Sequence, residues 1–335
     1  MQYRHATDAQ HVVAAVIANN ANEVLLSLRP AHVHQAGLWE FPGGKVETGE
    51  DARRALVREL DEELGIKAVS ARPMIRIRHD YPEKSVLLDV WYVDAYTGEP
   101  QGREGQQINW VPRAELIQRK FPAANIPIVN SVRLPSLYLI TPEPGDDSDG
   151  FLGKLEQALM AGVRLVQLRA NAYSTLQYEE LARKAIDLCH SYNAQLILNS
   201  SPNPAERLGA DGVHLNSSRL MKMNCRPVAG DMWLSASCHS RQEVEQAILV
   251  GVDFIVISPV LATASHPGAS ELGWEGFAHL CDCATMPAYA LGGMASQYMG
   301  TAWQHGAQGI AVISAIWKSP AMETEIRNCL AKTGS

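Results

Sequence analysis

The stretch EFPGGKVETGEDARRALVRELDEELGI, residues 40–66, joins a Gly-Gly turn to a segment with helical periodicity. Its apolar residues recur three and four positions apart and a glycine follows them, so we predict a helix over Asp51–Leu64. These same offsets place Glu59, Glu62 and Glu63 on one patch of that helix. Because like charges at this spacing repel each other by about 0.2–0.5 kcal/mol per pair, the cluster indicates a bound cation.

The residues around the helix favour a divalent metal. Hard cations prefer oxygen ligands, and Mg²⁺ is commonly shared between carboxylates and substrate phosphates. Gly43 and Gly44 allow a close backbone approach, and the Gly43 carbonyl is a further candidate ligand. Arg58 can brace one carboxylate through a bidentate pair. A solvated acidic helix would account for E-x-x-E-E alone, whereas the wider pattern favours one or more Mg²⁺ or Mn²⁺ ions.

That wider pattern resembles the Nudix box. Gly44, five residues, Glu50, seven residues and then REL-x-EE-x-GI, residues 58–66, match it position by position. Together with LWEFPGGKVETGE, GEPQGREGQ and FPAANIP, the box makes the first domain similar to the MutT-type 8-oxo-dGTP diphosphatases. The resemblance implies a set of metal-site residues: Gly43, Glu59, Glu62, Glu63 and Glu104.

The same resemblance implies residue roles and a reaction. Glu62 is either a metal ligand or the residue that prepares the attacking water, and Asn125 reads the purine edge. The implied catalytic group comprises Arg58, Glu59, Glu62, Glu63 and Glu104, and the implied substrate contacts are Arg29, His34, Gly44, Lys45 and Asn125. Water is expected to attack the β-phosphorus of an oxidised guanine nucleotide such as 8-oxo-dGTP, giving a nucleoside monophosphate and pyrophosphate.

Three of these residues have simpler interpretations when they are taken alone. Asn125 then fits a turn or helix cap, His34 an ordinary surface histidine, and Glu104 a solvated carboxylate in a glycine-rich turn.

Residues 1–133 are expected to form an α+β domain, and the Nudix resemblance implies an α/β/α sandwich around a mixed sheet. HVVAAVIA and EVLLSLR, separated by NNANE, predict a hairpin, and PMIRIRHDY with SVLLDVWYVDAY predicts a second strand pair. A short helix is expected near Ala123–Val132.

Residues 134–335 show a different rhythm. Eight short apolar runs recur about every 20–30 residues between helical patterns: SLYLIT, LVQLR, QLILN, GVHL, WLSAS, FIVISP, AYALGG and GIAVIS. They predict a (β/α)8 TIM barrel, with an open doubly wound sheet as the alternative. In such a barrel the strand ends YALGGM and AVISAI form a candidate phosphate site.

With LVQLRAN, LILNSSP, ADGVHL and SASCHS, these strand ends resemble the thiamine-phosphate synthase and TenI superfamily. The resemblance implies a thiamine or thiazole phosphate as ligand, and the following barrel residues as its contacts: Gln167, Arg169, Asn199, Gly292, Gly293, Ile313 and Ser314.

Several functional positions of that superfamily are altered. Asn171 replaces a pyrophosphate-binding lysine, Ser200 and Ser201 replace a metal-binding aspartate and an arginine, and the second acidic site reads NSSR. Loss of both carboxylates argues against synthase activity. For a TenI-type tautomerase, Pro259 stands where a catalytic histidine is expected, and His239 or His266 are the substitutes. A barrel that senses a ligand, or serves only as a scaffold, is the remaining alternative.

The fused barrel adds an alternative for the first domain, hydrolysis of a thiamine-pathway pyrophosphate. A net charge of −7 argues against partners such as a nucleic-acid duplex or a membrane surface. With no apolar span and six cysteines outside any C-x-x-C pair, the sequence predicts a cytoplasmic protein with reduced thiols. It sets no expectation for the oligomeric state.

Overall fold

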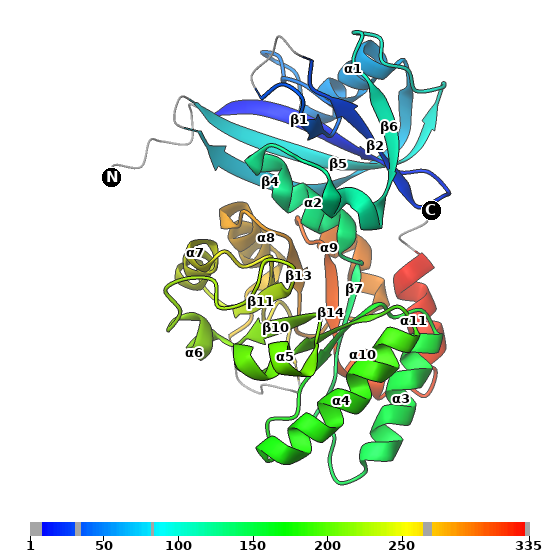
Figure 1. Ribbon diagram of the computed structural model, residues 1–335. Helices are drawn as coiled ribbons and strands as arrows, with labels where there is room; N and C mark the ends of the chain where they lie inside the picture. Colours follow the sequence, from blue (N-terminus) through cyan, green and yellow to red (C-terminus); the bar gives the residue numbers. More distant parts are fainter. Residues whose placement is uncertain (1–8, 31–34, 82–83, 264–269, 332–335) are drawn as a thin grey trace. The chain divides into compact units, whose positions relative to one another are not determined.

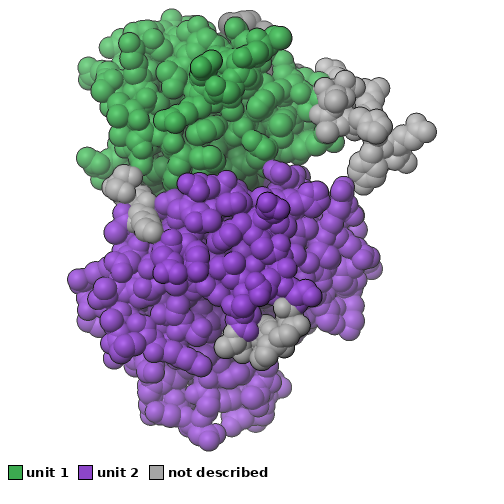
Figure 2. All heavy atoms as spheres, turned by 180° about the vertical axis from the view of Figure 1, so that it is seen from behind, with its two compact units in different colours: residues 1–133 green, residues 134–335 purple. Residues whose placement is uncertain are grey.

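The computed structural model describes residues 9–30, 35–81, 84–263 and 270–331 of the 335-residue chain (Figure 1). The chain divides into two compact units, Met1–Arg133 and Leu134–Ser335, which Figure 2 shows in separate colours. Within the described residues, none of the helices has the length and apolar character needed to cross a membrane.

The first unit contains two three-stranded sheets, with strand orders β1-β5-β4 and β3-β2-β6. In the first sheet β1 runs parallel to β5, and β4 pairs with β5 antiparallel; in the second, both pairs are antiparallel. The strands are β1 (Gln10–Ile17), β2 (Glu23–Leu28), β3 (Trp39–Glu40), β4 (Lys67–Asp80), β5 (Ser85–Thr97) and β6 (Ile108–Pro112). The helices are α1 (Ala52–Leu64), η1 (Arg113–Gln118), η2 (Ala123–Asn125) and α2 (Ile126–Arg133).

Strand β1 separates the two cores of the first unit. Val13, Ala15 and Ile17 are buried in one cluster with the apolar face of α1, whereas Ala14 and Val16 are buried in a second cluster with α2. Successive side chains of a strand point to opposite faces, so β1 contributes to both layers. This confirms the expected α/β/α sandwich with a mixed sheet.

Helix α1 forms where the periodicity predicts it. The side chain of Asp51 caps its first turn by accepting the N–H of Arg54 at 2.9 Å. Gly65 ends the helix in the left-handed conformation, with φ of 71°, and its N–H donates to the carbonyl of Asp61 at 3.0 Å. The helix that carries the predicted metal-site carboxylates is therefore held at both ends.

The predicted hairpin forms only at its turn. Ala18 and Val24 make an antiparallel bridge and the N–H of Asn19 donates to the carbonyl of Glu23 at 3.1 Å, but among the described residues no ladder continues between β1 and β2; β1 instead pairs along its whole length with β5. β1 is an edge strand of the sheet β1-β5-β4 and is buried on both faces, so its partner is set by packing rather than by the nearest turn. The predicted β4–β5 pair and the short helix near Ala123–Val132 are both confirmed.

The second unit is a closed barrel of eight parallel strands in the order β10-β11-β12-β13-β14-β7-β8-β9. All eight apolar runs form its strands, which confirms the TIM barrel and excludes the open sheet: β7 (Leu137–Ile140), β8 (Leu165–Leu168), β9 (Gln195–Leu198), β10 (Gly212–Leu215), β11 (Trp233–Cys238), β12 (Phe254–Ile257), β13 (Ala288–Ala290) and β14 (Gly309–Val312). The helices are α3 (Ser148–Met160), α4 (Thr175–Ser191), α5 (Pro202–Leu208), α6 (Ser217–Leu220), α7 (Arg241–Val250), α8 (Gly273–Cys283), η3 (Ser296–Tyr298), α9 (Met299–Gln304), α10 (Ser314–Trp317) and α11 (Met322–Ala331).

Aromatic side chains fill the barrel interior. The ring of Phe254 lies edge-on to those of Tyr138, Trp233 and Tyr289, with centroids 5.6–5.9 Å apart. Gln167 and His214, late in their strands, are buried polar residues. The barrel therefore has an apolar core and a polar region near the carboxyl ends of its strands.

Candidate functional site

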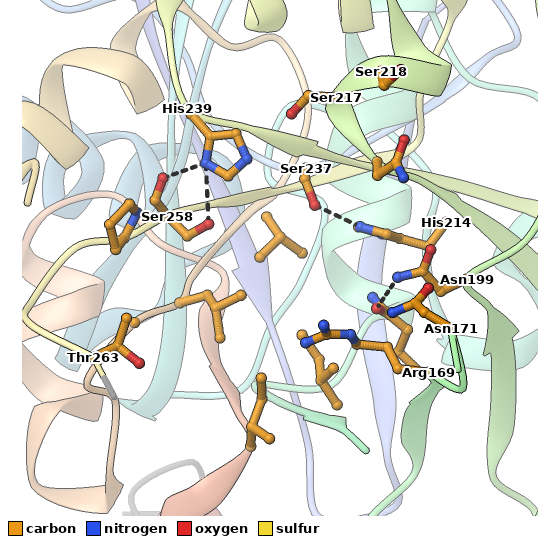
Figure 3. A pocket seen from close by; sticks show the side chains of 18 of the residues that line it. Arg169, Asn171, Asn199, His214, Ser217, Ser218, Ser237, His239, Ser258 and Thr263 are labelled. Atoms are coloured by element: carbon orange, nitrogen blue, oxygen red, sulfur yellow. Dashed lines mark hydrogen bonds between the residues drawn. The ribbon is translucent and has the colours of Figure 1, made fainter. Parts of the chain in front are cut away.

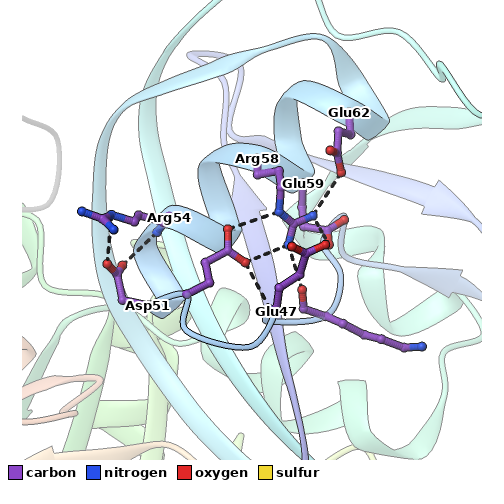
Figure 4. Close-up of polar contacts among 8 residues, drawn as sticks. Glu47, Asp51, Arg54, Arg58, Glu59 and Glu62 are labelled. Carbon is purple, nitrogen blue, oxygen red and sulfur yellow. Dashed lines mark hydrogen bonds and ion pairs between the residues drawn. The ribbon is translucent and has the colours of Figure 1, made fainter.

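Arg58 organises the acidic face of α1 (Figure 4). Its guanidinium donates to Glu50 at 2.9 and 3.2 Å, to Glu59 at 2.8 Å and to Glu62 at 3.0 Å. It also donates to the carbonyl of Lys45 at 2.9 Å, which ties the helix to the preceding loop. Hydrogen bonds to three carboxylates raise the pKa of Arg58, and its hydrogen bonds lower the pKa of Glu50. The predicted bracing role of Arg58 thus has a clear geometric basis.

Arg58→Lys is expected to lower kcat/KM for hydrolysis by about 10²-fold. A single ammonium cannot satisfy Glu50, Glu59 and Glu62 together, so the carboxylates lose their common support. Steady-state kinetics measure the effect. Arg54→Lys is the matched control, because Arg54 lies on the same helix with a side chain 80% exposed. Equal activity of both variants would rule out the bracing role.

The Gly-Gly turn lies close to β1 and to the Glu59 side chain of α1. A Cβ on Gly43 would lie 2.2 Å from the carbonyl oxygen of Val13, and one on Gly44 would lie 2.3 Å from the Glu59 carboxylate. The N–H of Gly43 donates to Glu63 Oε2 at 3.1 Å. Gly43 is therefore required by its close approach to the backbone of β1, whereas the neighbour of Gly44 is the end of a flexible side chain; the turn lies beside two of the predicted metal-site carboxylates.

Glu63 is the most strongly perturbed carboxyl of the cluster. Burial raises its pKa to about 8, the Gly43 N–H opposes this shift, and the nearby carboxylates of Glu104, Glu40 and Glu59 add to it. Among the described residues no cationic side chain pairs with Glu63. A half-buried acid surrounded by other acids is a donor set that suits a hard divalent cation.

The carboxylates do not stand ready-made as ligands. Across the described ranges, no three His, Cys, Asp or Glu side chains are arranged as a metal site. Glu59 and Glu62 bond to Arg58, and Glu63 bonds to Gly43. The oxygen atoms of these residues are chemically suitable as metal ligands. In this structure, however, the side chains are oriented toward their hydrogen-bond donors, Arg58 and the Gly43 N–H.

The loop between β5 and β6 brings Glu104 to the helix. The N–H of Arg103 donates to the carbonyl of Glu63 at 2.9 Å, and the Arg103 guanidinium donates to the carbonyl of Asp61 at 2.9 Å. Gln106 donates from Nε2 to the Glu63 carbonyl at 3.1 Å and accepts the N–H of Glu104 at 2.9 Å. Gln106 therefore joins the two segments that carry Glu63 and Glu104. Its role was not predicted, because a glutamine two residues from Glu104 gives no signal of its own.

Gln106→Met is expected to raise the divalent-ion concentration for half-maximal hydrolysis by about tenfold. Methionine keeps the volume of the side chain but removes both hydrogen bonds, so the loop with Glu104 is less firmly placed. A metal titration of activity gives the answer. Gln107→Met is the control, since Gln107 is exposed next to it. A change in maximal rate without a change in metal requirement would contradict the positioning role.

The structure describes most, but not all, of the predicted substrate-binding residues. Arg29 forms an ion pair with Glu40, whose pKa is raised by burial against the effect of that arginine. Lys45 is exposed and Asn125 is half-buried at the end of η2. The amide of Asn125 has no hydrogen-bond partner among the described residues, which leaves it available to a ligand. His34 lies outside the described residues.

In the second unit a cavity of about 680 Å³ opens at the carboxyl ends of the strands (Figure 3). Five of the seven predicted ligand residues line it: Gln167, Arg169, Asn199, Gly292 and Ile313. Gly293 and Ser314 are not among its described lining residues. Gly292 has φ of 101°, and a Cβ there would lie 2.9 Å from Pro259, so this glycine is required by the backbone.

A chain of polar side chains runs beside the cavity. Gln167 donates to the hydroxyl of Tyr138 at 3.0 Å and accepts from Asn199 at 3.2 Å. The oxygen of Asn199 in turn accepts from Arg219. The amide orientations of both predicted residues are therefore fixed by neighbours, and Arg219 was missed because it was considered only within the altered NSSR segment.

His214 is a lining residue that the sequence did not reveal. It is 2% exposed, and its two ring nitrogens bond to Ser235 at 2.9 Å and Ser237 at 2.8 Å. Burial lowers its pKa to about 3, aided by the nearby positive groups Arg219, Arg169 and His239. The ring is thus neutral at physiological pH. The serines occupy alternate positions on the adjacent strand, a signal that could have pointed to it.

The altered positions have local roles of their own. Asn171 lines the cavity and donates to Glu143 at 2.8 Å. Ser200 bonds to the carbonyl of Ser201 at 2.8 Å. Pro259 and His239 both line the cavity, and His239 Nδ1 bonds to the carbonyl oxygen of Ser258 at 2.5 Å. His266 lies outside the described residues.

Comparison with known proteins separates the two units. A family model described as a NUDIX domain matches residues 13–131, and one described as thiamine monophosphate synthase matches residues 137–316. The first unit is similar to the 8-oxo-dGTP diphosphatase of Escherichia coli strain K12, 36% identical over 122 residues that make up 36% of this chain and 95% of that protein.

Two further relatives extend the comparison. The CTP pyrophosphohydrolase of the same strain is 41% identical over 120 residues, 36% of this chain and 88% of that protein. The thiamine-phosphate synthase of Thermus thermophilus is 32% identical over 196 residues, 58% of this chain and 95% of that protein. The chain therefore belongs to the thiamine monophosphate synthase family through its second unit and carries a MutT-like Nudix hydrolase domain as its first.

Proposed function

We propose that the first unit hydrolyses oxidised purine nucleoside triphosphates, with 8-oxo-dGTP as the preferred substrate, to a nucleoside monophosphate and pyrophosphate. The observation that carries the proposal is the arrangement of α1, the Gly-Gly turn and the Glu104 loop, which bring acidic groups together around Glu63. The similarity to an 8-oxo-dGTP diphosphatase supports the choice of substrate.

Glu59, Glu63, Glu104 and the carbonyl of Gly43 are the groups we assign to Mg²⁺ or Mn²⁺. When bound, such an ion neutralises phosphate charge and lowers the pKa of a coordinated water. Arg58 orients Glu59 and Glu62 from one side. Glu62, whose side chain is 59% exposed, can approach the solvent side of the site and accept the proton of the attacking water at its carboxylate.

Base recognition is assigned to Asn125, with Arg29 and Lys45 near the phosphates. An amide can pair with a purine edge through one donor and one acceptor, and the amide of Asn125, which has no partner among the described residues, has both. Glu40 restrains Arg29 and so belongs to the same region.

A hydrolysis screen with Mg²⁺ tests the proposal. Turnover of 8-oxo-dGTP, dGTP, CTP and hydroxymethylpyrimidine pyrophosphate is compared under the same conditions. The similarity to a CTP pyrophosphohydrolase makes CTP a necessary competitor. A preference for 8-oxo-dGTP supports the assignment, a preference for CTP changes the base, and a preference for the pyrimidine pyrophosphate establishes the thiamine-pathway alternative.

For the second unit we propose binding of a thiamine-related phosphate without synthase turnover. The cavity and its fixed amides Gln167 and Asn199 support a ligand site. The absence of acidic side chains at Ser200 and in the NSSR segment, residues 216–219, argues against a metal–pyrophosphate reaction. Thermal-shift titration with thiazole phosphate and thiamine phosphate tests binding, and an unchanged melting temperature with both leaves only a scaffold role.

A further inference from the structure

The described lining of the barrel cavity carries positive charge without negative charge. It includes Arg169 but no aspartate or glutamate. Glu143 lies beside the cavity, where its oxygens accept from the amide of Asn171 and the N–H of Ala172 at 2.8 and 3.3 Å. Among the described lining residues, no carboxylate is therefore available to a metal ion or to the arginine.

Arg169 enters the cavity with a free head group. Its backbone is fixed at both ends, because its N–H donates to the hydroxyl of Thr141 at 2.9 Å and its carbonyl accepts from that hydroxyl at 3.4 Å. Its guanidinium makes no hydrogen bond or ion pair with any described residue (Figure 3). The side chain thus presents unsatisfied donors to whatever occupies the cavity.

Arg219 adds a second positive charge behind the wall. It is half-buried and donates to the oxygen of Asn199 and to the carbonyl of His214 at 3.3 Å, both of which belong to lining residues. Its Nε is buried and lacks a partner, and no carboxylate of the described chain pairs with it. A partly buried cation without a counter-ion is unfavourable, so an anion bound nearby would stabilise it.

We propose that this cavity binds a phosphate monoester as a dianion without any divalent cation, through direct contact with Arg169 and the field of Arg219. The inference rests on the ligand-binding role proposed above for the barrel. Guanidinium groups match the oxygen geometry of phosphate and keep their charge at all relevant pH values. Magnesium needs anionic oxygen ligands, which the described lining does not offer. Ile140, Val256 and Leu291 provide apolar surface for the organic part of the ester.

Isothermal titration of the full chain with thiamine phosphate in EDTA tests the inference. We expect binding that a millimolar excess of Mg²⁺ does not strengthen, and much weaker binding of unphosphorylated thiamine. Arg169→Gln should weaken binding by about 30-fold and Arg219→Gln by about tenfold, as for loss of a charge-assisted contact and of a nearby charge. Arg183→Gln, an exposed arginine on α4, is the control and should bind normally.

The outcomes separate the two levels of the proposal. Binding that requires Mg²⁺ would overturn the metal-free site while leaving the phosphate-binding role intact. No binding under either condition would overturn both. Equal affinities of the wild type and Arg169→Gln, measured on variants with unchanged circular dichroism and melting temperature, would place the ligand elsewhere. If unphosphorylated thiamine bound as tightly as thiamine phosphate, the phosphate group would not be what the cavity recognises, and the proposal would be wrong.

Discussion

Glu63→Gln is expected to lower kcat/KM of the first unit by about 10³-fold. Glutamine keeps the shape of the side chain and can still accept the N–H of Gly43, which lies 3.1 Å from the present carboxylate. What it loses is the carboxyl group that can ionise and bind a cation at the centre of the acidic cluster. Steady-state kinetics over a Mg²⁺ titration measure the loss, which we expect to persist at saturating metal.

Glu115→Gln changes an exposed glutamate on η1 and should retain full activity, which controls for a general effect of charge. The folded state should be at least as stable in Glu63→Gln as in the wild type, because the carboxylate is destabilised by burial and by three neighbouring acids. Full activity of Glu63→Gln would remove this residue from the metal site and with it the central assignment.

Gly43→Ala is expected to destabilise the first unit by about 3 kcal/mol and to abolish detectable hydrolysis. The new Cβ would lie 2.2 Å from the carbonyl oxygen of Val13 and 2.8 Å from Cα of Ala14, and neither backbone atom can move without distorting β1. The φ of 148° adds backbone strain. Hydrogen exchange followed by mass spectrometry can assign the destabilisation to peptides of the first unit.

Gly49→Ala separates the two causes. Gly49 lies in the same loop with a positive φ of 85°, but a Cβ there meets no atom within 4 Å. Its alanine variant should suffer only the conformational term, about 1 kcal/mol, and should keep its activity. If both alanine variants behaved alike, the close approach of the turn to β1 would not be the reason for Gly43.

Local patterns in the sequence predicted much of the fold. The helix α1 follows from its apolar spacing, and its limits follow from Asp51 and Gly65. The eight barrel strands follow from short apolar runs, because a strand covered on both faces needs no alternation. The NNANE turn was predicted, but the long pairing of β1 with β5 was not, because that partner is set by packing between segments far apart in the chain.

In the candidate sites too, residues related by local spacing could be predicted, whereas residues that act through long-range contacts could not. Glu59, Glu62 and Glu63 could be found because helical spacing brings them together, whereas Gln106 and Arg219 act through contacts with residues far away in the chain. Their partners depend on the folded loop and barrel, so no short motif contains the pair. The residue roles carried over from the family resemblance stay predictions until the variants are measured.

Strand β1 also has a consequence for the dynamics of the hydrolase site. Three backbone hydrogen bonds join β1 to the turn that lies next to the acidic cluster. The N–H of Val13 donates to Gly44 at 2.8 Å, that of Ala15 to Pro42 at 2.7 Å, and that of Val46 to His11 at 3.0 Å. Since both faces of β1 are buried, this turn cannot open as a separate flap. Any movement that accompanies substrate entry and product release is therefore expected in other segments, while the turn keeps its position beside the active site.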